Sequence, residues 1–117
     1  MNNILTFLKT ASVLFMVELG WFTTGGTYGF KMIEQIQEKP AQMRFVGAFI
    51  LFLFISYMLL QTKSATEAFL YGVCIYGFSN FNSYFLFTYY DLKYAIAETL
   101  WGGILFVTSR YLLQLWS

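Results

Sequence analysis

The chain has 117 residues and a net charge of +1; 58% of its residues are apolar and only 11% are charged. Soluble domains carry about 25% charged residues, and a soluble fold of this size leaves roughly a third or more of its unfolded-chain surface exposed. Seven basic and six acidic side chains could not cover that surface. The composition argues against a soluble globule and against disorder, and it predicts a protein that lives in a lipid bilayer.

Several function classes are excluded by residues that the chain lacks. No basic stripe is present to neutralise a phosphate backbone, so we expect no nucleic-acid partner. There is no His and only one Cys, Cys74, which rules out an imidazole base, a His-ligated metal and an internal disulfide. We therefore expect no catalytic residue, no metal and no cofactor, and we interpret Cys74 as a small core residue.

Gaps between charged residues locate the helices. Residues 45–62 and 68–90 are uncharged, and each stretch is long enough for a transmembrane helix. The first and last apolar stretches each contain a carboxylate. The first also lacks the basic start of a signal peptide, so we expect it to remain as an anchor. We predict an all-α four-helix transmembrane bundle with antiparallel hairpins, in one integral membrane domain over residues 1–117. The predicted helices span about 4–24, 44–62, 66–88 and 92–115.

The connections are short except for the first, which covers residues 25–43. Phe30, Ile33 and Ile36 recur there at helical spacing before Pro40, and this favours a short amphipathic helix at the membrane interface. A solvated loop is the alternative. Before the last helix, Asp91 is placed to cap its N-terminus. The neighbouring pair Tyr89-Tyr90, like Trp116 at the far end, suits the interfacial belts of a membrane protein.

Glu18 and Glu98 are the two acids inside predicted spans, where ionisable residues are costly and therefore mark candidate functional sites. Glu18 lies six residues before the end of the first predicted helix, and Glu98 lies six residues after the start of the last. With a rise of 1.5 Å per residue, both lie roughly 9 Å below the same face of the membrane. The matched depth predicts one shared site. The alternative is that each Glu is protonated, forms hydrogen bonds that hold the helices together, and binds no ligand.

The third predicted helix adds polar groups on the same side, within otherwise aromatic sequence. Amides and hydroxyls there could donate to a buried carboxylate. Gly72 and Gly77 in this helix, with Gly102 and Gly103 in the last, should allow the two helices to approach closely. The candidate ligand-binding or proton-binding residues are Glu18, Glu98, Asn80, Asn82, Ser83, Tyr76, Trp21 and Trp101.

A short pattern occurs twice in the chain. Glu18-Leu-Gly-Trp21 and Glu98-Thr-Leu-Trp101 both read Glu-x-x-Trp. If their helices run in opposite directions, Trp21 should lie nearer the interface and Trp101 deeper in the membrane. An indole N–H at depth requires an acceptor. Chance is the alternative to a repeat.

The same motifs resemble an uncharacterised family of small four-helix membrane proteins, the domain of unknown function numbered 2177. The family occurs in bacteria, with related versions in large DNA viruses. Its acid-x-x-Trp motif in helix one is matched by Glu18 and Trp21, with Glu in place of the usual Asp. Its Asp-x-x-Trp-Gly motif in the last helix is matched by Glu98, Trp101 and Gly102. The resemblance spans nearly the whole chain.

The third helix departs from the family pattern Gly-x-x-x-Tyr-x-x-Tyr-Asp-x-Thr-Asn. Gly72 and Tyr76 match it, whereas the positions of Tyr, Asp, Thr and Asn hold Ser79, Asn80, Asn82 and Ser83. The loss of an acid at position 80 reduces a three-acid site to two acids. These departures, with the many Phe and Tyr residues, fit a viral version. The family has no established activity, so the resemblance implies only the fold and the position of the site.

Two classes of function follow from these features. The first is a multi-pass membrane protein that binds or transports a proton, a small cation or a small molecule at its two carboxylates. The second is a structural or assembly protein, for example of an internal viral membrane, in which the polar cluster holds the bundle together. An enzyme acting on lipid is a weaker third class, since no nucleophile–base pair is present. The expected partners are the lipid bilayer, further copies of the chain, and neighbouring membrane or capsid proteins.

Overall fold

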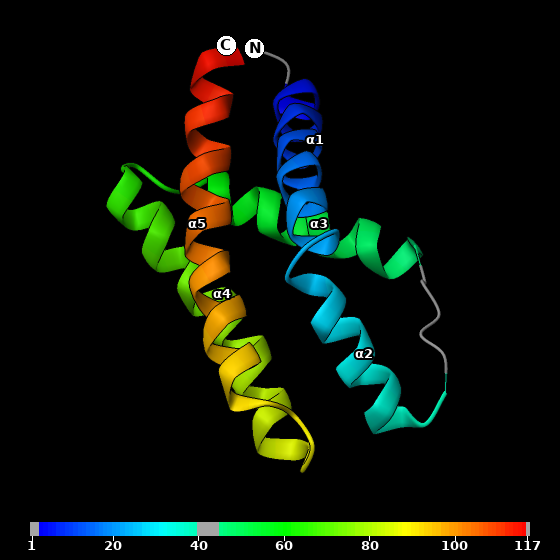
Figure 1. Ribbon diagram of the computed structural model, residues 1–117. Helices are drawn as coiled ribbons and strands as arrows, with labels where there is room; N and C mark the ends of the chain where they lie inside the picture. Colours follow the sequence, from blue (N-terminus) through cyan, green and yellow to red (C-terminus); the bar gives the residue numbers. More distant parts are fainter. Residues whose placement is uncertain (1–2, 40–44, 117) are drawn as a thin grey trace.

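The structure is a computed structural model, and it describes residues 3–39 and 45–116. These residues form helices joined by short turns, without strands, which confirms the all-α prediction for this part of the chain. Figure 1 shows the elements in order. They are α1 (Asn3–Phe22), α2 (Gly26–Gln37), α3 (Phe45–Leu60), α4 (Ala65–Leu86) and α5 (Leu92–Trp116).

The α4–α5 hairpin packs along its length, as the glycines predicted. A Cβ atom on Gly72 would lie 2.1 Å from the carbonyl oxygen of Gly102, and one on Gly103 would lie 2.6 Å from the Phe69 ring. The contact at Gly72 requires glycine because the Gly102 backbone cannot move aside as a flexible side chain can. The hairpin turn places Asp91 before α5, where its Oδ1 accepts the backbone N–H of Lys93 at 2.8 Å. The predicted N-cap of α5 is therefore confirmed.

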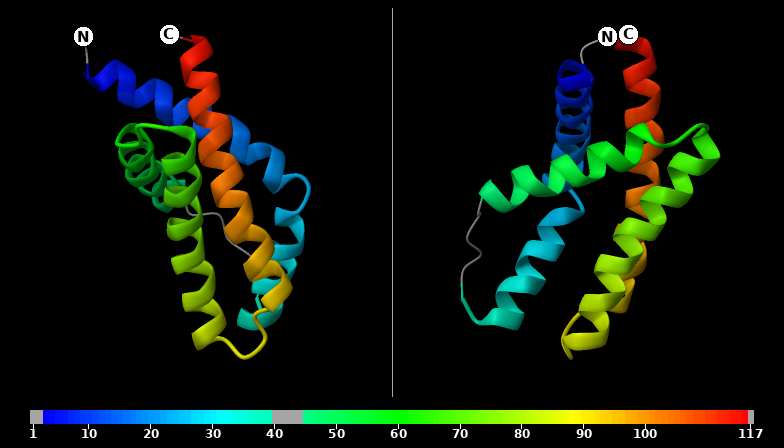
Figure 2. Two further views of the ribbon diagram at one scale, coloured as in Figure 1. Left: turned by 90° about the vertical axis from the view of Figure 1, so that its left-hand side faces the viewer. Right: turned by 180° about the vertical axis from the view of Figure 1, so that it is seen from behind.

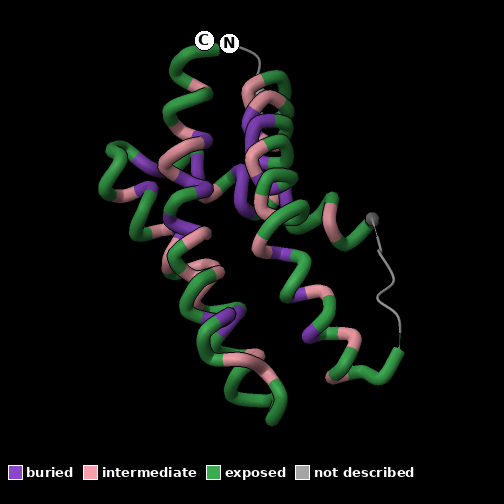
Figure 3. The backbone as a smooth tube through the Cα atoms, viewed as in Figure 1, coloured by how far each residue is buried: buried purple, intermediate pink, exposed green. Residues whose placement is uncertain are grey.

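Helix α3 takes a direction that the sequence did not predict. Figures 1 and 2 show it crossing α1 and α5 at a steep angle, so it does not form an antiparallel hairpin with α4. One face of α3, formed by Phe52, Ile55 and Leu59, packs in the main core together with Leu14 of α1 and Phe106 of α5. Figure 3 shows that buried residues gather around this crossing.

The turn after α3 is tied to α5. The side chain of Arg110 donates through Nη1 to the carbonyl oxygen of Thr62 at 2.9 Å and to its hydroxyl at 3.2 Å. The Thr62 hydroxyl donates in turn to the carbonyl of Leu59 at 2.6 Å. This attachment fixes the end of α3 beside α5 and gives a physical reason for the crossing direction.

Helix α2 confirms the predicted short helix within residues 25–43, and it packs against the start of α5. It ends at Gln37, followed by Glu38 in a left-handed conformation with φ 58°, whereas Pro40 lies outside the described residues. Its buried face is Gly26, Gly29 and Met32, whereas Ile33 is 43% exposed. Gly29 lets α2 approach Tyr94 of α5 closely, and Gly26 lies against Trp21 of α1.

The predicted four-helix transmembrane bundle is not confirmed. The described residues form five helices, because the short helix joins the four longer ones. Within them only α1 combines the length and the apolar composition of a membrane-crossing helix, over Ile4–Phe22, and Val46–Leu60 is apolar but shorter. Helices α4 and α5 are long enough, but their Ser, Asn, Tyr and charged residues lower their mean hydropathy. The finding for α1 is weak evidence taken alone, since N-terminal signals and core helices share these properties.

Candidate functional site

Glu18 and Glu98 lie against one cavity of about 210 Å³. Glu18 comes from the last turns of α1 and is 5% exposed, while Glu98 comes from the first turns of α5 and is half-buried. Tyr76 of α4 lines the same cavity, and Phe52 contributes to its apolar wall. The two acids that shared a calculated depth are thus neighbours in space. We call them, with the side chains that donate to them, the carboxylate cluster.

The buried carboxylate of Glu18 is held by two neutral donors. The Tyr76 hydroxyl donates to its Oε2 atom at 2.8 Å, and the indole N–H of Trp101 donates to the same oxygen at 3.4 Å. Both donors come from other helices, α4 and α5, so the carboxylate joins three helices. The bonds from neutral groups orient the carboxylate without supplying a compensating charge.

Glu98 is held by three neutral donors. The side-chain amide of Asn80 donates to Oε1 at 2.9 Å, and Trp21 of α1 donates to Oε2 at 3.3 Å. The Tyr94 hydroxyl, one turn earlier on α5, donates to the same Oε2 atom. Between the described residues, no Lys or Arg forms an ion pair with Glu98 or with Glu18. The cluster therefore contains two acids and no internal cation.

The two Glu-x-x-Trp segments interlock. Trp21 donates to the Glu of the α5 segment, and Trp101 donates to the Glu of the α1 segment. The two indoles stack between them, with ring centroids 5.3 Å apart and planes 12° apart. The two rings therefore lie side by side, although Trp21 and Trp101 are displaced in opposite directions from the two Glu residues along their helices. Helical side chains lean toward the N-terminus of their own helix, and α1 and α5 run in opposite directions (Figure 1), so the two indoles lean toward each other.

The turn between α4 and α5 closes one side of the cluster. Tyr90 donates through its hydroxyl to Oδ1 of Asn80 at 2.6 Å, which orients the amide nitrogen toward Glu98 and toward the carbonyl of Tyr76. Burial, together with the charge of the nearby Glu98, raises the pKa of the Tyr90 phenol to about 12. Tyr90 therefore stays protonated and keeps donating at any physiological pH. Its neighbour Tyr89 is exposed.

Helix α2 covers the cluster near Tyr94. A Cβ atom on Gly29 would lie 2.3 Å from the Tyr94 hydroxyl oxygen, so this glycine makes room for one of the donors to Glu98. A second cavity of about 170 Å³ lies here, lined by Trp21, Tyr94, Glu98 and residues of α2. Glu98 thus borders two cavities, one on each side of the cluster.

Six of the eight candidate residues meet in the cluster, and two do not. Asn82 is exposed, and Ser83 is half-buried near the end of α4, where its carbonyl oxygen accepts the N–H of Phe87 at 2.8 Å. Tyr94 was missed, although its spacing of four residues from Glu98 places both on one helical face. Tyr90 was also missed as a site residue, because it lies in a turn and helical spacing could not place it beside the cluster. The interpretation of Cys74 as a core residue is wrong, since it is exposed.

The cluster has too few ligands for a typical metal site. No group of three or more His, Cys, Asp or Glu side chains suited to a metal ion occurs within residues 3–39 and 45–116. Comparison with known proteins adds no assignment: no family model, no curated protein and no solved structure matches the chain. The function must therefore be argued from the geometry of the site.

Proposed function

We propose that the protein is a multi-pass integral membrane protein whose carboxylate cluster binds a proton or a small cation. The observation that carries this proposal is a pair of carboxyl groups on one cavity, held only by neutral donors. Two negative charges in an apolar setting repel each other and lose hydration. Binding of a proton or a positively charged ligand between Glu18 and Glu98 relieves both penalties.

The bilayer location is supported by the apolar residues on the outside of the helices. Phe85 and Phe78 of α4 are 83% and 78% exposed, and Val46 and Phe54 of α3 are 75% and 68% exposed. Soluble monomers rarely expose such extended apolar surface. Helices α4 and α5 have 22 and 25 residues, which at 1.5 Å per residue exceed the roughly 30 Å hydrocarbon core. Lipid contact would make this surface favourable.

The volume and lining of the cavity favour a small ligand with apolar groups. Its volume of about 210 Å³ is below the roughly 300–1,000 Å³ of pockets for drug-sized ligands. Its other walls are mostly apolar, formed by Phe22, Leu51, Phe52 and Ile75, with Ser79 also present. A small alkylammonium ion would place its charge at the carboxylates and its alkyl groups on these walls. The position of Glu98 between two cavities favours transfer of a proton or cation over permanent retention.

The binding experiment uses tetraethylammonium as the probe and the protein reconstituted in liposomes. Trp21 and Trp101 report occupancy through their fluorescence, because both donate to the acids that would bind the ion. We expect saturable binding by the native chain and at least a tenfold loss in the double variant Glu18→Gln/Glu98→Gln. The control is Glu67→Gln, which changes a carboxylate at the start of α4, outside the cavity. Unchanged binding by the double variant would overturn the proposal.

A structural role is the second candidate, favoured by the interlocked Trp–Glu pairs that join α1 to α5. In this role the protein would assemble with copies of itself or with neighbouring membrane or capsid proteins, as in an internal viral membrane. Gln also accepts hydrogen bonds, so the double variant should then melt and assemble like the native chain. Absence of probe binding by the native chain, together with that result, would favour this candidate.

The native Cys74 tests the membrane location without any substitution. Its side chain is exposed in the middle of α4, so water would reach it in a soluble protein. In lipid we expect no reaction with a membrane-impermeant maleimide until denaturing detergent is added. The control is Lys63→Cys combined with Cys74→Ser, which places the thiol in the exposed turn before α4 and should react at once from one side. Equal labelling of Cys74 before and after detergent contradicts the location.

A further inference from the structure

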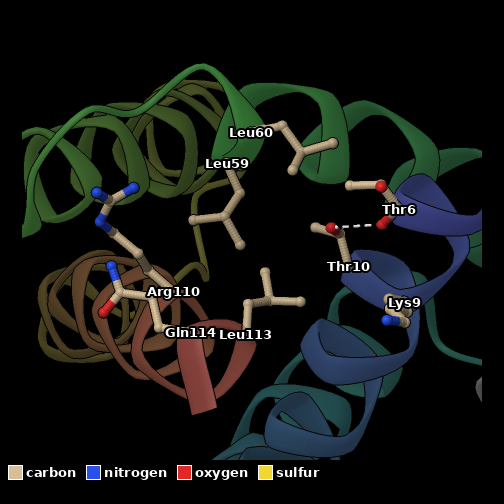
Figure 4. Close-up of a pocket in the computed structure, with 8 residues that line it drawn as sticks. All are labelled: Thr6, Lys9, Thr10, Leu59, Leu60, Arg110, Leu113 and Gln114. Carbon is tan, nitrogen blue, oxygen red and sulfur yellow. Dashed lines mark hydrogen bonds between the residues drawn. The ribbon is translucent and has the colours of Figure 1, made fainter. Parts of the chain in front are cut away.

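A separate pocket lies at the end of the molecule that holds both termini. It has a volume of about 250 Å³ and lies between α1, α3 and α5. Figure 4 shows its eight lining side chains. Leu59, Leu60 and Leu113 form an apolar part, and Lys9 and Arg110 flank it from α1 and α5. We call it the cationic pocket. None of its lining residues belongs to the carboxylate cluster.

The two cations of this pocket have only neutral partners among the residues that the structure describes. Arg110 uses Nη1 to bind the carbonyl and hydroxyl of Thr62, which holds the guanidinium in place. The Lys9 ammonium lies 5.4 Å from the ring centroid of Trp116, a cation–π distance. No Asp or Glu lines the pocket. Two fixed positive charges thus border an apolar cavity without a compensating anion.

The position along the helices indicates what kind of anion fits. Lys9 lies six residues from the start of α1, and Arg110 lies six residues from the end of α5, so both lie roughly 9 Å from the helix ends. From this depth in a bilayer, the long Lys and Arg side chains reach toward the phosphate groups of lipids, and basic pockets between helices bind anionic headgroups. Arg is also well suited to phosphate because of its planar donors.

We propose that the cationic pocket binds an anionic phospholipid, with its phosphate between Lys9 and Arg110 and its acyl chain against Leu59, Leu60 and Leu113. The inference rests on the proposed bilayer location but not on ligand binding by Glu18 and Glu98. It goes beyond the proposed function, because it assigns a second ligand to the opposite end of the helices.

The test titrates detergent-purified protein with short-chain phosphatidylglycerol or phosphatidylcholine and counts bound lipid by native mass spectrometry. We expect at least tenfold preference for phosphatidylglycerol. Each charge removed should reduce this affinity about fivefold, so Lys9→Gln loses about fivefold and Lys9→Gln/Arg110→Gln falls to the level of phosphatidylcholine. The single Lys9 variant keeps the test valid if loss of the Arg110–Thr62 bonds unfolds the double variant.

The matched control is Lys63→Gln, an exposed cation in the α3–α4 turn that does not line the pocket. It should retain the full preference, and so should Glu18→Gln/Glu98→Gln, which separates this inference from the proposed function. Equal binding of the two lipids by the native chain overturns the inference. An equal loss in the Lys63 variant overturns it too, since general surface charge would then be responsible. Displacement of the lipid by equimolar inorganic phosphate would assign the pocket to free phosphate instead.

Discussion

The carboxylate cluster and the cationic pocket lie toward opposite ends of α1 and α5, and they hold charges of opposite sign. In the cluster, Glu18 and Glu98 accept hydrogen bonds from Tyr, Trp and Asn side chains inside the protein. In the pocket, Lys9 and Arg110 lie beside apolar side chains and bind only neutral groups. About 14–18 Å of helix separates the acid from the cation on each helix.

This separation explains how one small chain can present two kinds of site. An ion pair between the acids and the cations would neutralise both ends and leave neither able to attract a charged ligand. Neutral donors instead orient the carboxylates while leaving their charge in place. The following substitutions test the difference between the two ends, from the largest expected effect to the smallest.

Gly72→Ala should have the largest effect, because the new methyl group would meet the backbone of Gly102. We expect the free energy of unfolding in detergent to fall by about 3 kcal/mol. Helix α4 supplies Tyr76 and Asn80 to the cluster but no residue to the pocket. Probe binding should therefore be lost while the preference for anionic lipid persists. In the control Gly47→Ala, the new methyl group enters open space on α3. This variant should be neutral or stabilised by up to about 1 kcal/mol. Equal melting temperatures of the two variants would contradict the packing of Gly72 against Gly102.

Tyr76→Phe should cost about 2 kcal/mol, since it removes the shorter of the two bonds to the buried Glu18 carboxylate. Chemical denaturation in detergent measures the loss. Tyr57→Phe is the matched control, because Tyr57 is 57% exposed on α3 and its hydroxyl should contribute little. A loss of similar size in both variants would show that the Tyr76 bond is not specific to the cluster.

Trp101→Phe should cost about 1 kcal/mol, and Trp21→Phe should cost less. Without Trp101, Glu18 keeps only the Tyr76 bond, whereas Glu98 without Trp21 keeps two donors. Both variants retain an aromatic ring for the stack, so the difference reports the indole N–H groups. Thermal melts of the two variants, measured together, compare these losses. A larger loss in Trp21→Phe than in Trp101→Phe would be evidence against interlocked pairs.

The smallest effect belongs to the exposed bond between Tyr28 of α2 and Asp91 at the start of α5. The bond from Tyr28, with the N–H of Lys93, lowers the pKa of Asp91 from 3.8, and the same bond raises the pKa of Tyr28 above 10.0. Because the pKa of Asp91 is lowered in the folded chain, the bond stabilises the fold above about pH 4. This stabilisation is lost as the pH falls further. Because the pKa of Tyr28 is raised in the folded chain, the bond also stabilises the fold below about pH 10. This stabilisation is lost as the pH rises further.

The native chain should therefore melt slightly above Tyr28→Phe between about pH 4 and pH 10, and the two melting curves should converge beyond both limits. A difference that persists unchanged at pH 2 would mean that the hydroxyl acts through another partner. Because the bond is exposed, raising the salt concentration should also reduce the difference.

The parts of the site that follow simple spacing were predictable from the sequence. The shared depth of Glu18 and Glu98 came from charge gaps and helical rise, and the close α4–α5 approach came from glycines. The direction of α3 was not predictable, because its apolar residues occur on all sides and fix no inward face. Tyr90 was not predictable either, since a turn residue has no periodicity and its bond to Asn80 depends on how the turn folds.

The buried face of α2 was not predicted. Its larger apolar residues indicated an amphipathic helix at the membrane interface, and nothing in the sequence indicated that Gly29 lies against Tyr94 of α5 or that Gly26 lies against Trp21 of α1. Glycines on both helices indicated the α4–α5 contact, whereas the glycines of α2 lie against aromatic residues and have no matching glycines to indicate their contacts.

The central claim, that Glu18 and Glu98 together bind a proton or a small cation, is tested most directly by proton release. Tetraethylammonium is added to the native protein in weakly buffered liposomes, and a pH-sensitive dye follows the solution. The account predicts release of protons that saturates with probe binding, and no release from Glu18→Gln/Glu98→Gln that remains folded by circular dichroism. Undiminished proton release from that variant, or probe binding without any release at a pH where the cluster holds a proton, would contradict it.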